Sequence, residues 1–192
     1  MYVQKSAVKA FTEKLVQKVS ALKMGAGLDA SSTQGPLVNE AAVKKTREHV
    51  EDATSKGAKL EVGGNPRPNS AGYFFEPTVV SGVTADMMVS RDETFGPLAP
   101  IFSFETEDEV VRLANDTEFG LAGYFFSRDV GRAWRVAQRL QVGMVGVNTG
   151  KISAAEAPFG GVKESGYGKE GSLYGLADYQ NIKSITFGNL QS

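Results

Sequence analysis

The sequence of 192 residues contains no cysteine and only one histidine. Without cysteine, the chain itself can form no disulfide, no cysteine-ligated metal site and no thiolate nucleophile. The single histidine, His49, excludes a multi-histidine metal site and leaves one imidazole as a candidate base. It ends the charged run Lys44–His49, which predicts a solvent-facing position on a helix. No metal site is expected, and His49 has no evident serine partner for a Ser/His/Asp site.

An excess of charge of either sign is also missing. The formal net charge is -1, so no basic field points to nucleic acid or to an anionic membrane as a partner. The apolar runs are far shorter than a membrane span. The length and an ordinary composition predict one well-packed domain. The sequence leaves the compartment open between the cytoplasm and the mitochondrial matrix.

Hydrophobic periodicity predicts helices that alternate with short apolar strands. The helices are expected over residues 5–23, 39–56, 106–115 and 129–140. Asn39 suits the N-cap of the second helix, and residues 106–109 form a capping box that opens the third. In the second helix, one face is shared by Val43, Thr46, Val50 and Ala53. Strands are expected at 2–4, 59–62, 74–80, 100–104, 121–127, 145–148 and 182–187, with a polar surface loop at 63–72. Two helices carry stripes that we expect to be buried: Val8, Phe11, Leu15, Val19 and Leu22 in the first, and Val130, Ala133, Trp134, Ala137 and Leu140 in the last. This alternation predicts an α/β fold with a mostly parallel sheet flanked by helices.

One glycine-rich segment, Gly166–Gly171, has the spacing of a dinucleotide-binding fingerprint, G-x-G-x-x-G. That motif works between a strand and a helix, with an acidic residue about twenty positions later for the ribose. Here the preceding residues, 158–165, do not form a strand pattern, and residues 188–190 are not acidic. We therefore interpret the match as a coincidence in a glycine-rich loop.

Two other segments carry candidate chemistry. In Glu93–Pro97, a carboxylate and an aromatic side chain lie on a rigid Gly-Pro turn. The carboxylate of Glu93 can accept hydrogen bonds from vicinal hydroxyls such as those of a ribose, and Phe95 can pack against a flat ring. The long loop from Asn148 to Gly171 offers a hydroxyl at Ser153 and an aromatic at Phe159. Taken singly, each segment is also compatible with an ordinary surface turn or a structural loop.

The motifs together are more specific than any one of them. They follow the order Glu93–Pro97, Asn115–Ala122, Val142–Asn148 and Pro158–Gly161. This order resembles the aldehyde dehydrogenase superfamily over residues from Tyr2 to about Asp178. Within it, segments 33–37, 93–100, 143–150 and 166–172 most resemble the succinate-semialdehyde dehydrogenases. The resemblance implies that residues 1–178 are the C-terminal portion of the catalytic domain and residues 179–192 an oligomerisation strand and tail.

The resemblance also implies roles for individual residues. The carboxylate of Glu93 would bind the hydroxyls of the nicotinamide ribose of NAD or NADP, with Phe95 packed beside it. Ser153 would hold the distal carboxylate of succinate semialdehyde, and Phe159 would line the aldehyde tunnel. The last strand, Ile182–Phe187, resembles the strand through which such enzymes pair with a neighbouring subunit, which implies a homo-oligomer.

Much of the family's chemistry is expected to lie outside this chain. The nucleophilic cysteine of the family precedes the segment that matches Tyr2–Gln4. The general-base glutamate, the oxyanion-hole asparagine, the nucleotide-binding domain and the arginines that grip the substrate carboxylate lie further upstream. Lys151 departs from the apolar residue typical of the family, and is either a solvent-facing lysine or an added positive charge near Ser153.

Two main hypotheses follow. In the first, the chain is part of an NAD- or NADP-dependent dehydrogenase that converts an aldehyde, succinate semialdehyde by resemblance, into an acid. It would then bind its cofactor incompletely and be inactive alone, with no catalytic residue of its own. In the second, it is a non-catalytic scaffold or subunit that associates with full-length partners. An unrelated α/β binding domain would require several motifs to be coincidental.

Overall fold

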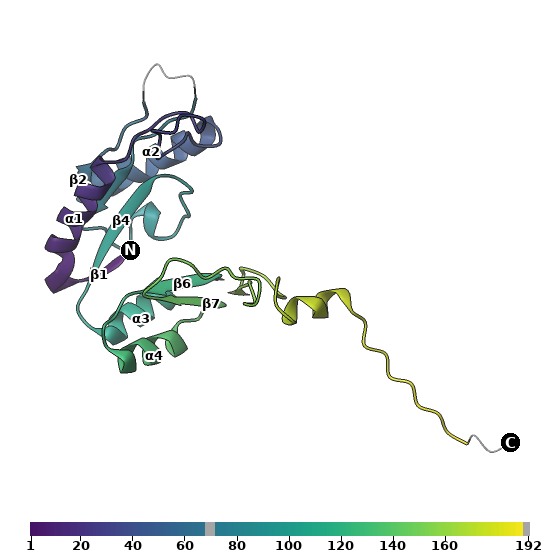
Figure 1. Cartoon of the computed structure of the whole chain (residues 1–192). Helices are drawn as coiled ribbons and strands as arrows, with labels where there is room; N and C mark the ends of the chain where they lie inside the picture. The colour runs from purple at the N-terminus through teal and green to yellow at the C-terminus, as the bar shows by residue number, and fades with distance from the viewer. Residues whose placement is uncertain (68–71, 190–192) are drawn as a thin grey trace. The chain divides into compact units, whose positions relative to one another are not determined.

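A computed structural model describes residues 1–67 and 72–189 of the chain (Figure 1). Residues 68–71, part of the predicted polar loop, and residues 190–192, part of the predicted tail, lie outside the described residues. The chain divides into two compact units, Met1–Val110 and Val111–Ser192. Each unit is described by itself.

A four-stranded sheet forms the centre of the first unit. Its strands are β1 (Tyr2–Gln4), β2 (Lys59–Val62), β3 (Thr78–Ser81) and β4 (Leu98–Phe104), in the order β1-β4-β3-β2. β4 is parallel to both β1 and β3, whereas β2 is antiparallel to β3. The sheet is therefore mixed but mostly parallel, as the alternation of helices and strands predicts.

The long helices of this unit are α1 (Val8–Ser20), preceded by the 3₁₀ turn η1 (Lys5–Ala7), and α2 (Glu40–Ser55). A second 3₁₀ turn, η2 (Met88–Ser90), precedes β4. The side chain of Asn39 caps α2 by accepting a hydrogen bond from the backbone N–H of Ala42 at 2.9 Å. Beyond its last turn, Gly57 takes a left-handed backbone (φ +97°), which ends the helix.

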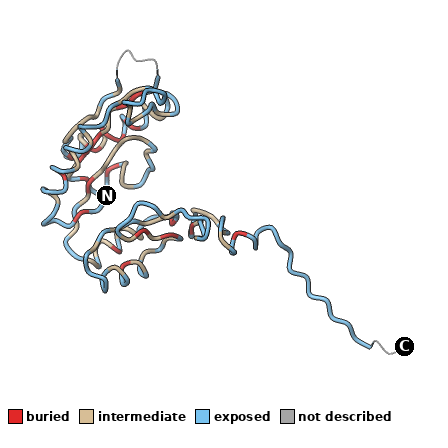
Figure 2. Tube along the Cα trace, viewed as in Figure 1, coloured by how far each residue is buried: buried red, intermediate tan, exposed pale blue. Residues whose placement is uncertain are grey.

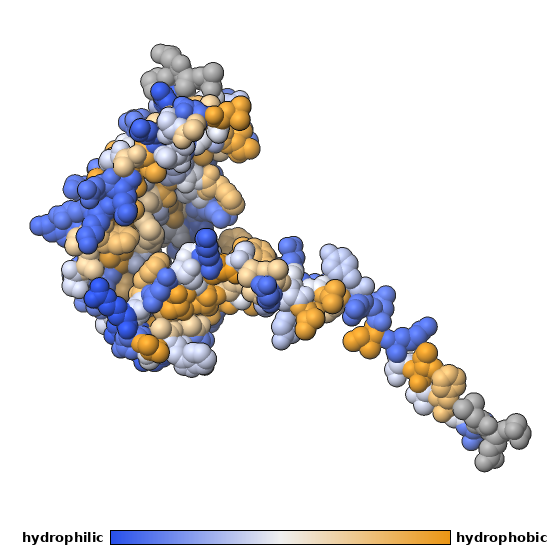
Figure 3. Space-filling view, in the orientation of Figure 1, coloured by the Kyte–Doolittle hydropathy of each residue, from blue (hydrophilic) through white to orange (hydrophobic). Residues whose placement is uncertain are grey.

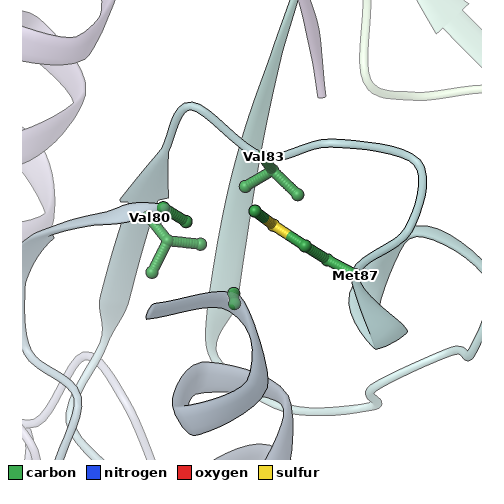
Figure 4. Close-up of a cluster of buried hydrophobic side chains, with 5 residues drawn as sticks. Val80, Val83 and Met87 are labelled. Carbon is green, nitrogen blue, oxygen red and sulfur yellow. The ribbon is translucent and has the colours of Figure 1, made fainter. Parts of the chain in front are cut away.

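The two central strands are buried on both faces. Val79 belongs to a core cluster with Val3 and Ile101, against which α1 packs. The next residue, Val80, belongs to a second cluster with Val83 and Met87, which includes Ala53 of α2 (Figure 4). Since successive side chains of a strand point to opposite faces, consecutive apolar residues are needed to build two cores at once.

The prediction for the apolar stripe of α1 is partly wrong. Val8, Leu15 and Val19 pack against the sheet as expected. Phe11 and Leu22 are exposed, whereas Thr12 and Val16 lie on the sheet-facing side. At about 100° per residue, positions 11 and 22 fall at the edge of the face centred on residues 8, 12, 15, 16 and 19.

The helix α3 (Glu107–Asn115) begins at the end of the first unit and continues into the second. Its start is the predicted capping box. The Thr106 hydroxyl accepts from the backbone N–H of Glu109 at 3.2 Å, and the Glu109 carboxylate accepts from the N–H of Glu105 at 2.8 Å and of Thr106 at 3.4 Å.

The second unit is built around a βαβ element, in which α4 (Val130–Arg139) connects the parallel strands β6 (Ala122–Phe125) and β7 (Met144–Val147). Two further short strands, β5 (Phe119–Gly120) and β8 (Val162–Lys163), pair antiparallel. A 3₁₀ segment, η3 (Tyr174–Tyr179), follows.

In α4, the predicted stripe is again wrong at its edge. Val130 and Trp134 are 83% and 70% exposed, and the buried position is Val136, which the stripe omits. The face that packs is centred on residues 133, 136, 137 and 140, and Trp134 lies about 110° away from its centre. In both helices the predicted stripe includes a large aromatic side chain, Phe11 or Trp134, that is exposed in the structure.

The C-terminal segment forms no strand with any described residue. Ile182, Ile185 and Phe187 are all exposed, and the segment extends away from the rest of the second unit without packing (Figure 2). Apolar and polar side chains alternate along its surface (Figure 3). The predicted strand Ile182–Phe187 is therefore absent from the single chain, because a strand requires a hydrogen-bonding neighbour.

The α/β prediction with a mostly parallel sheet flanked by helices is confirmed. Among residues 1–67 and 72–189, every helix is too short or too polar to cross a lipid bilayer.

Candidate functional site

The turn Glu93–Pro97 lies between η2 and β4 in the first unit. Two backbone hydrogen bonds shape its end. The N–H of Leu98 donates to the carbonyl of Gly96 at 2.8 Å, and the N–H of Thr78 donates to the carbonyl of Pro97, also at 2.8 Å. Phe95 has φ +49°, a left-handed conformation that is rare for a non-glycine residue. Unusual backbone of this kind is typical of functional turns that their surroundings hold in place.

The helix α2 holds this turn at two points. The hydroxyl of Thr94 lies 2.9 Å from Nδ1 of His49, within hydrogen-bonding distance. Gly96 lies so close to Thr46 that a Cβ atom added there would collide with the Thr46 hydroxyl. Thr46 is itself fully buried and donates to the carbonyl of Ala42 at 2.8 Å, so it has little freedom to move aside. The turn is therefore seated on the rigid surface of α2.

The two predicted cofactor-binding side chains project from this seated turn. Phe95 is 82% exposed. Glu93 is exposed, and its carboxylate has no hydrogen-bond or ion-pair partner within residues 1–67 and 72–189. The structure thus brings Glu93 and Phe95 together, with a carboxylate and an aromatic ring both open to a ligand.

The prediction that His49 faces solvent is wrong, since its side chain is completely buried. Its Nε2 atom is buried and has no hydrogen-bond partner among the described residues. Burial lowers the pKa of His49, and the positive charge of Lys45 lowers it further against the opposing effect of Asp92, Asp52 and Glu48. The imidazole is therefore neutral at pH 7.

The helical spacing carried a signal for this burial. His49 lies three residues after Thr46 and directly before Val50, two positions predicted to share one face of α2, and the structure buries both. The charged run from Lys44 to Glu48 masked that signal. The sequence carries no comparable signal for Thr94, because a threonine in a loop gives no sign of its partner.

In the second unit, the long loop after β7 begins with Asn148, which has φ +57°. Its side-chain oxygen accepts from the N–H of Ser127 at 2.9 Å, and its side-chain nitrogen donates to the carbonyl of Ser127 at 2.8 Å. Asn148 therefore joins the residues that follow β6 and β7, and fixes where the loop departs.

The remainder of the loop is fixed by backbone contacts. Phe159 and Glu170 exchange two backbone hydrogen bonds of 2.8 and 2.7 Å, and the Lys169 ammonium donates to the carbonyl of Gly161 at 2.7 Å. Gly143 lies against the carbonyl of Gly160, where any Cβ would collide. These contacts make the loop an ordered platform rather than an open excursion of the chain.

The predicted substrate-side residues lie on this platform. Ser153 and Phe159 are both exposed, and the Ser153 hydroxyl makes no hydrogen bond to the described residues. Lys151 is also exposed. The structure therefore brings Ser153 and Phe159 into one loop and leaves both available to a ligand.

The rejected fingerprint Gly166–Gly171 lies in the same loop. It follows the two-residue strand β8 only after a turn and precedes a 3₁₀ segment rather than an α-helix. Gly168 lies against the carboxylate of Asp178, which would oppose a phosphate at that position. Within residues 1–67 and 72–189, no three His, Asp or Glu side chains gather as metal ligands would.

The close packing of Gly96 on Thr46 predicts that Gly96→Ala destabilises the first unit by about 1–3 kcal/mol. The added methyl group would push the turn away from α2. Urea unfolding of the whole chain measures the loss. Gly35→Ala is the matched control, because a Cβ there has open space around it and the free energy of unfolding should barely change. Equal effects of the two substitutions would contradict the packing argument.

The buried, neutral His49 predicts that the free energy of unfolding falls as the pH drops below about 6.5. The unfolded chain takes up a proton near that pH, whereas the folded chain resists protonation because its pKa is lowered. The contribution is fully present above this range. His49→Asn should remove it, as measured by urea unfolding between about pH 8 and pH 5.

The amino group of Met1, whose pKa burial lowers to about 6, titrates in the same range. It is common to both proteins, so the difference between wild type and His49→Asn isolates the imidazole. Parallel pH profiles would show that His49 is not buried in its neutral form.

Comparison with known proteins identifies the chain's relatives. Residues 1–185 match the model of the aldehyde dehydrogenase family. The chain is 55% identical over 190 residues to 3-sulfolactaldehyde dehydrogenase of Pseudomonas putida and 53% identical over 190 residues to glutarate-semialdehyde dehydrogenase of Pseudomonas aeruginosa. In each case the match covers 99% of this chain and 39% of the relative. The chain thus spans about two fifths of the length of these relatives.

A solved structure agrees with these sequence matches. The crystal structure of succinate-semialdehyde dehydrogenase from Burkholderia pseudomallei superposes with a TM-score of 0.90 at 58% identity, covering 93% of this chain and 37% of that one. The seated turn, the ordered loop and the mostly parallel sheet are thus found in a chain that belongs to the aldehyde dehydrogenase family.

Proposed function

We propose that the chain is the C-terminal part of an NAD- or NADP-dependent dehydrogenase that oxidises succinate semialdehyde, or a similar aldehyde with a distal acidic group, to the acid. The observation that carries the proposal is the exposed, unpartnered Glu93 carboxylate beside the exposed Phe95 ring on a turn seated on α2. Family membership gives that arrangement its chemistry.

On the cofactor side, the residues present fit one wall of a nicotinamide nucleotide site. Glu93 would accept hydrogen bonds from the two hydroxyls of the nicotinamide ribose, and Phe95 would pack beside the sugar and ring. The cofactor, when bound, supplies the acceptor for the hydride that leaves the aldehyde carbon. Because the left-handed turn is already formed, little ordering of its backbone would be needed on binding.

On the substrate side, the ordered loop supplies a hydroxyl and an aromatic surface. Ser153 would donate a hydrogen bond to the distal acidic group, and Phe159 would line the path of the aldehyde. The names of the relatives support this substrate class, because succinate semialdehyde, glutarate semialdehyde and 3-sulfolactaldehyde all carry an acidic group away from the aldehyde. Lys151, two residues before Ser153, adds a positive charge to this part of the loop.

The proposal assigns the covalent chemistry to another part of the protein. Aldehyde oxidation by this family uses a thiolate nucleophile and a carboxylate base, and this chain contains no cysteine. The matched relatives are more than twice as long as the matched region, which supports the interpretation as a fragment. The chain alone would contribute surfaces to two sites and complete neither.

We expect the 192-residue chain, incubated with succinate semialdehyde and either NAD⁺ or NADP⁺, to show no formation of reduced nucleotide at 340 nm. Robust turnover would contradict the assignment of the chemistry to an upstream segment. In a protein that supplies that segment, Glu93→Gln should raise the KM for nucleotide by about tenfold, because an amide is a weaker acceptor for two hydroxyls than a carboxylate. Glu40→Gln, on the exposed first turn of α2, is the matched control.

A second candidate function is assembly with other dehydrogenase subunits, either as a homo-oligomer or as a non-catalytic partner. The observation that favours it is the extended, exposed segment Ile182–Phe187, whose apolar side chains have no cover among the described residues. Pairing with a strand edge of a neighbouring subunit would satisfy its backbone and bury these side chains.

Co-expression with a full-length relative, followed by size-exclusion chromatography, tests this assembly, and we expect the two chains to co-elute. Ile185→Pro should abolish co-elution, because proline removes a backbone donor from the strand. Ser184→Ala keeps that donor and should co-elute as the wild type does. Separate elution of the wild-type chain, or co-elution of the proline variant, would contradict pairing through this segment.

A further inference from the structure

The only imidazole in the chain lies within hydrogen-bonding distance of the predicted cofactor-binding turn. His49 is completely buried on α2, and its Nδ1 lies 2.9 Å from the hydroxyl of Thr94, which stands between Glu93 and Phe95. Its other ring nitrogen, Nε2, is buried without a partner among the described residues. Burial of an unpartnered ring nitrogen costs free energy that an apolar side chain at this position would not cost. We therefore expect the imidazole to make a contribution that an apolar side chain cannot make.

The geometry favours one tautomer. If Nδ1 carried no proton, the unpartnered Nε2 would bear a buried N–H donor, the kind of group that folded proteins rarely leave unsatisfied. With the proton on Nδ1, the imidazole donates to the Thr94 hydroxyl, and only an acceptor lone pair remains unpaired on Nε2. Protonation of Nε2 would place a charge and an unpaired donor in the interior.

The surroundings of His49 agree with a neutral ring. The charged groups that act on it are Lys45, Glu48 and Asp52 from its own helix and Asp92 from the segment before the turn. Desolvation outweighs the attraction of the three carboxylates and lowers the pKa of the imidazole. The ring that contacts Thr94 is therefore uncharged at neutral pH.

We propose that His49 is a positioning residue, which holds Thr94 through Nδ1 and thereby keeps the Glu93–Pro97 turn in the left-handed conformation that presents Glu93 and Phe95. This inference rests on the proposed function only for the role of Glu93 and Phe95 in cofactor binding. Its test measures the turn itself and needs no cofactor. Thr46, three residues earlier on the same helix face, receives Gly96. One helical turn thus supplies two fixed points on either side of Phe95.

The left-handed backbone of Phe95 needs support on both sides. A left-handed conformation at Phe95 is intrinsically unfavourable for a residue with a Cβ, so the turn would relax if either anchor were lost. The Gly96 contact limits how far the turn can approach α2, but it does not pull the turn inward. The hydrogen bond from His49 is directional and attractive, and it sets the position of the Thr94 side chain.

Matched variants separate the hydrogen bond from general packing. The side-chain amide of His49→Asn lies where Nδ1 lies and can still donate to Thr94, whereas that of His49→Gln reaches toward Nε2 and cannot. At the other partner, Thr94→Ser keeps the hydroxyl and Thr94→Val removes it. Val80→Ala destabilises the same unit from a core cluster that makes no contribution to this hydrogen bond.

Amide hydrogen exchange, read residue by residue by NMR on the 192-residue chain, is the measurement. The amide of Leu98 donates within the turn, and the amide of Ala53 lies in the buried part of α2. We expect His49→Gln and Thr94→Val to accelerate exchange of Leu98 by about five- to tenfold while Ala53 is unchanged. His49→Asn and Thr94→Ser should exchange as the wild type does, and Val80→Ala should not accelerate Leu98 selectively.

The ¹⁵N resonances of the imidazole give an independent readout. We expect a protonated, pyrrole-type shift for Nδ1 and a bare, pyridine-type shift for Nε2, with Thr94→Val altering the Nδ1 resonance. Unchanged exchange at Leu98 in both His49→Gln and Thr94→Val would overturn the proposal. So would equal acceleration of Leu98 and Ala53, which marks a purely structural role.

Titration with NAD⁺ distinguishes a failure of the positioning role from a failure of the proposed function. Selective acceleration at Leu98 supports the positioning role whether or not the nucleotide binds. If NAD⁺ shifts no resonance in residues 93–97 of any of these proteins or of a protein that supplies the upstream segment, the cofactor assignment fails and the positioning role stands.

Discussion

Strands β3 and β4 must present apolar side chains to two cores at once, and the arrangement of the first unit follows from that constraint. Val79 and Ile101 face the helix α1, while Val80 faces α2 together with Val83 and Met87. With helices packed on both faces, α2 cannot shift relative to β4 without disrupting a core. The turn Glu93–Pro97 leads directly into β4 and rests on α2, so the burial of the strands also determines where the turn lies.

The two candidate surfaces are built by the same device, the close approach of backbone to a neighbour where glycine leaves room. Gly96 meets Thr46 beneath the Glu93 turn, and Gly143 meets the carbonyl of Gly160 beneath the long loop. In both places the contact holds the backbone, which leaves the side chains Glu93, Phe95 and Ser153 facing outward. A fixed backbone with exposed side chains favours binding. The backbone loses its conformational entropy on folding, so that loss does not recur when a ligand binds.

Local signals in the sequence predicted what depends on local geometry. The capping box at Thr106, the cap at Asn39 and the Gly-Pro turn after Phe95 are each determined by a few neighbouring residues. The pairing of His49 with Thr94 joins residues 45 positions apart, and no periodicity or motif reports such a contact. The burial of a helix face was predicted, but its centre was displaced toward large side chains such as Phe11 and Trp134. The strand at Ile182–Phe187 depends on a partner that one chain does not supply, so its sequence pattern indicates a capacity for pairing rather than a structure.

The two hydrogen bonds between Asn148 and Ser127 have a consequence for how deamidation would affect the protein. The amide of Asn148 uses its oxygen to accept from the Ser127 N–H and its nitrogen to donate to the Ser127 carbonyl. Deamidation to aspartate would keep the first bond and replace the second with two oxygens that repel each other. This replacement of the side-chain nitrogen by oxygen would then loosen the junction between β6 and β7 and release the start of the loop that carries Ser153. The stability of this surface over time therefore depends on a single side-chain nitrogen at the junction of β6 and β7.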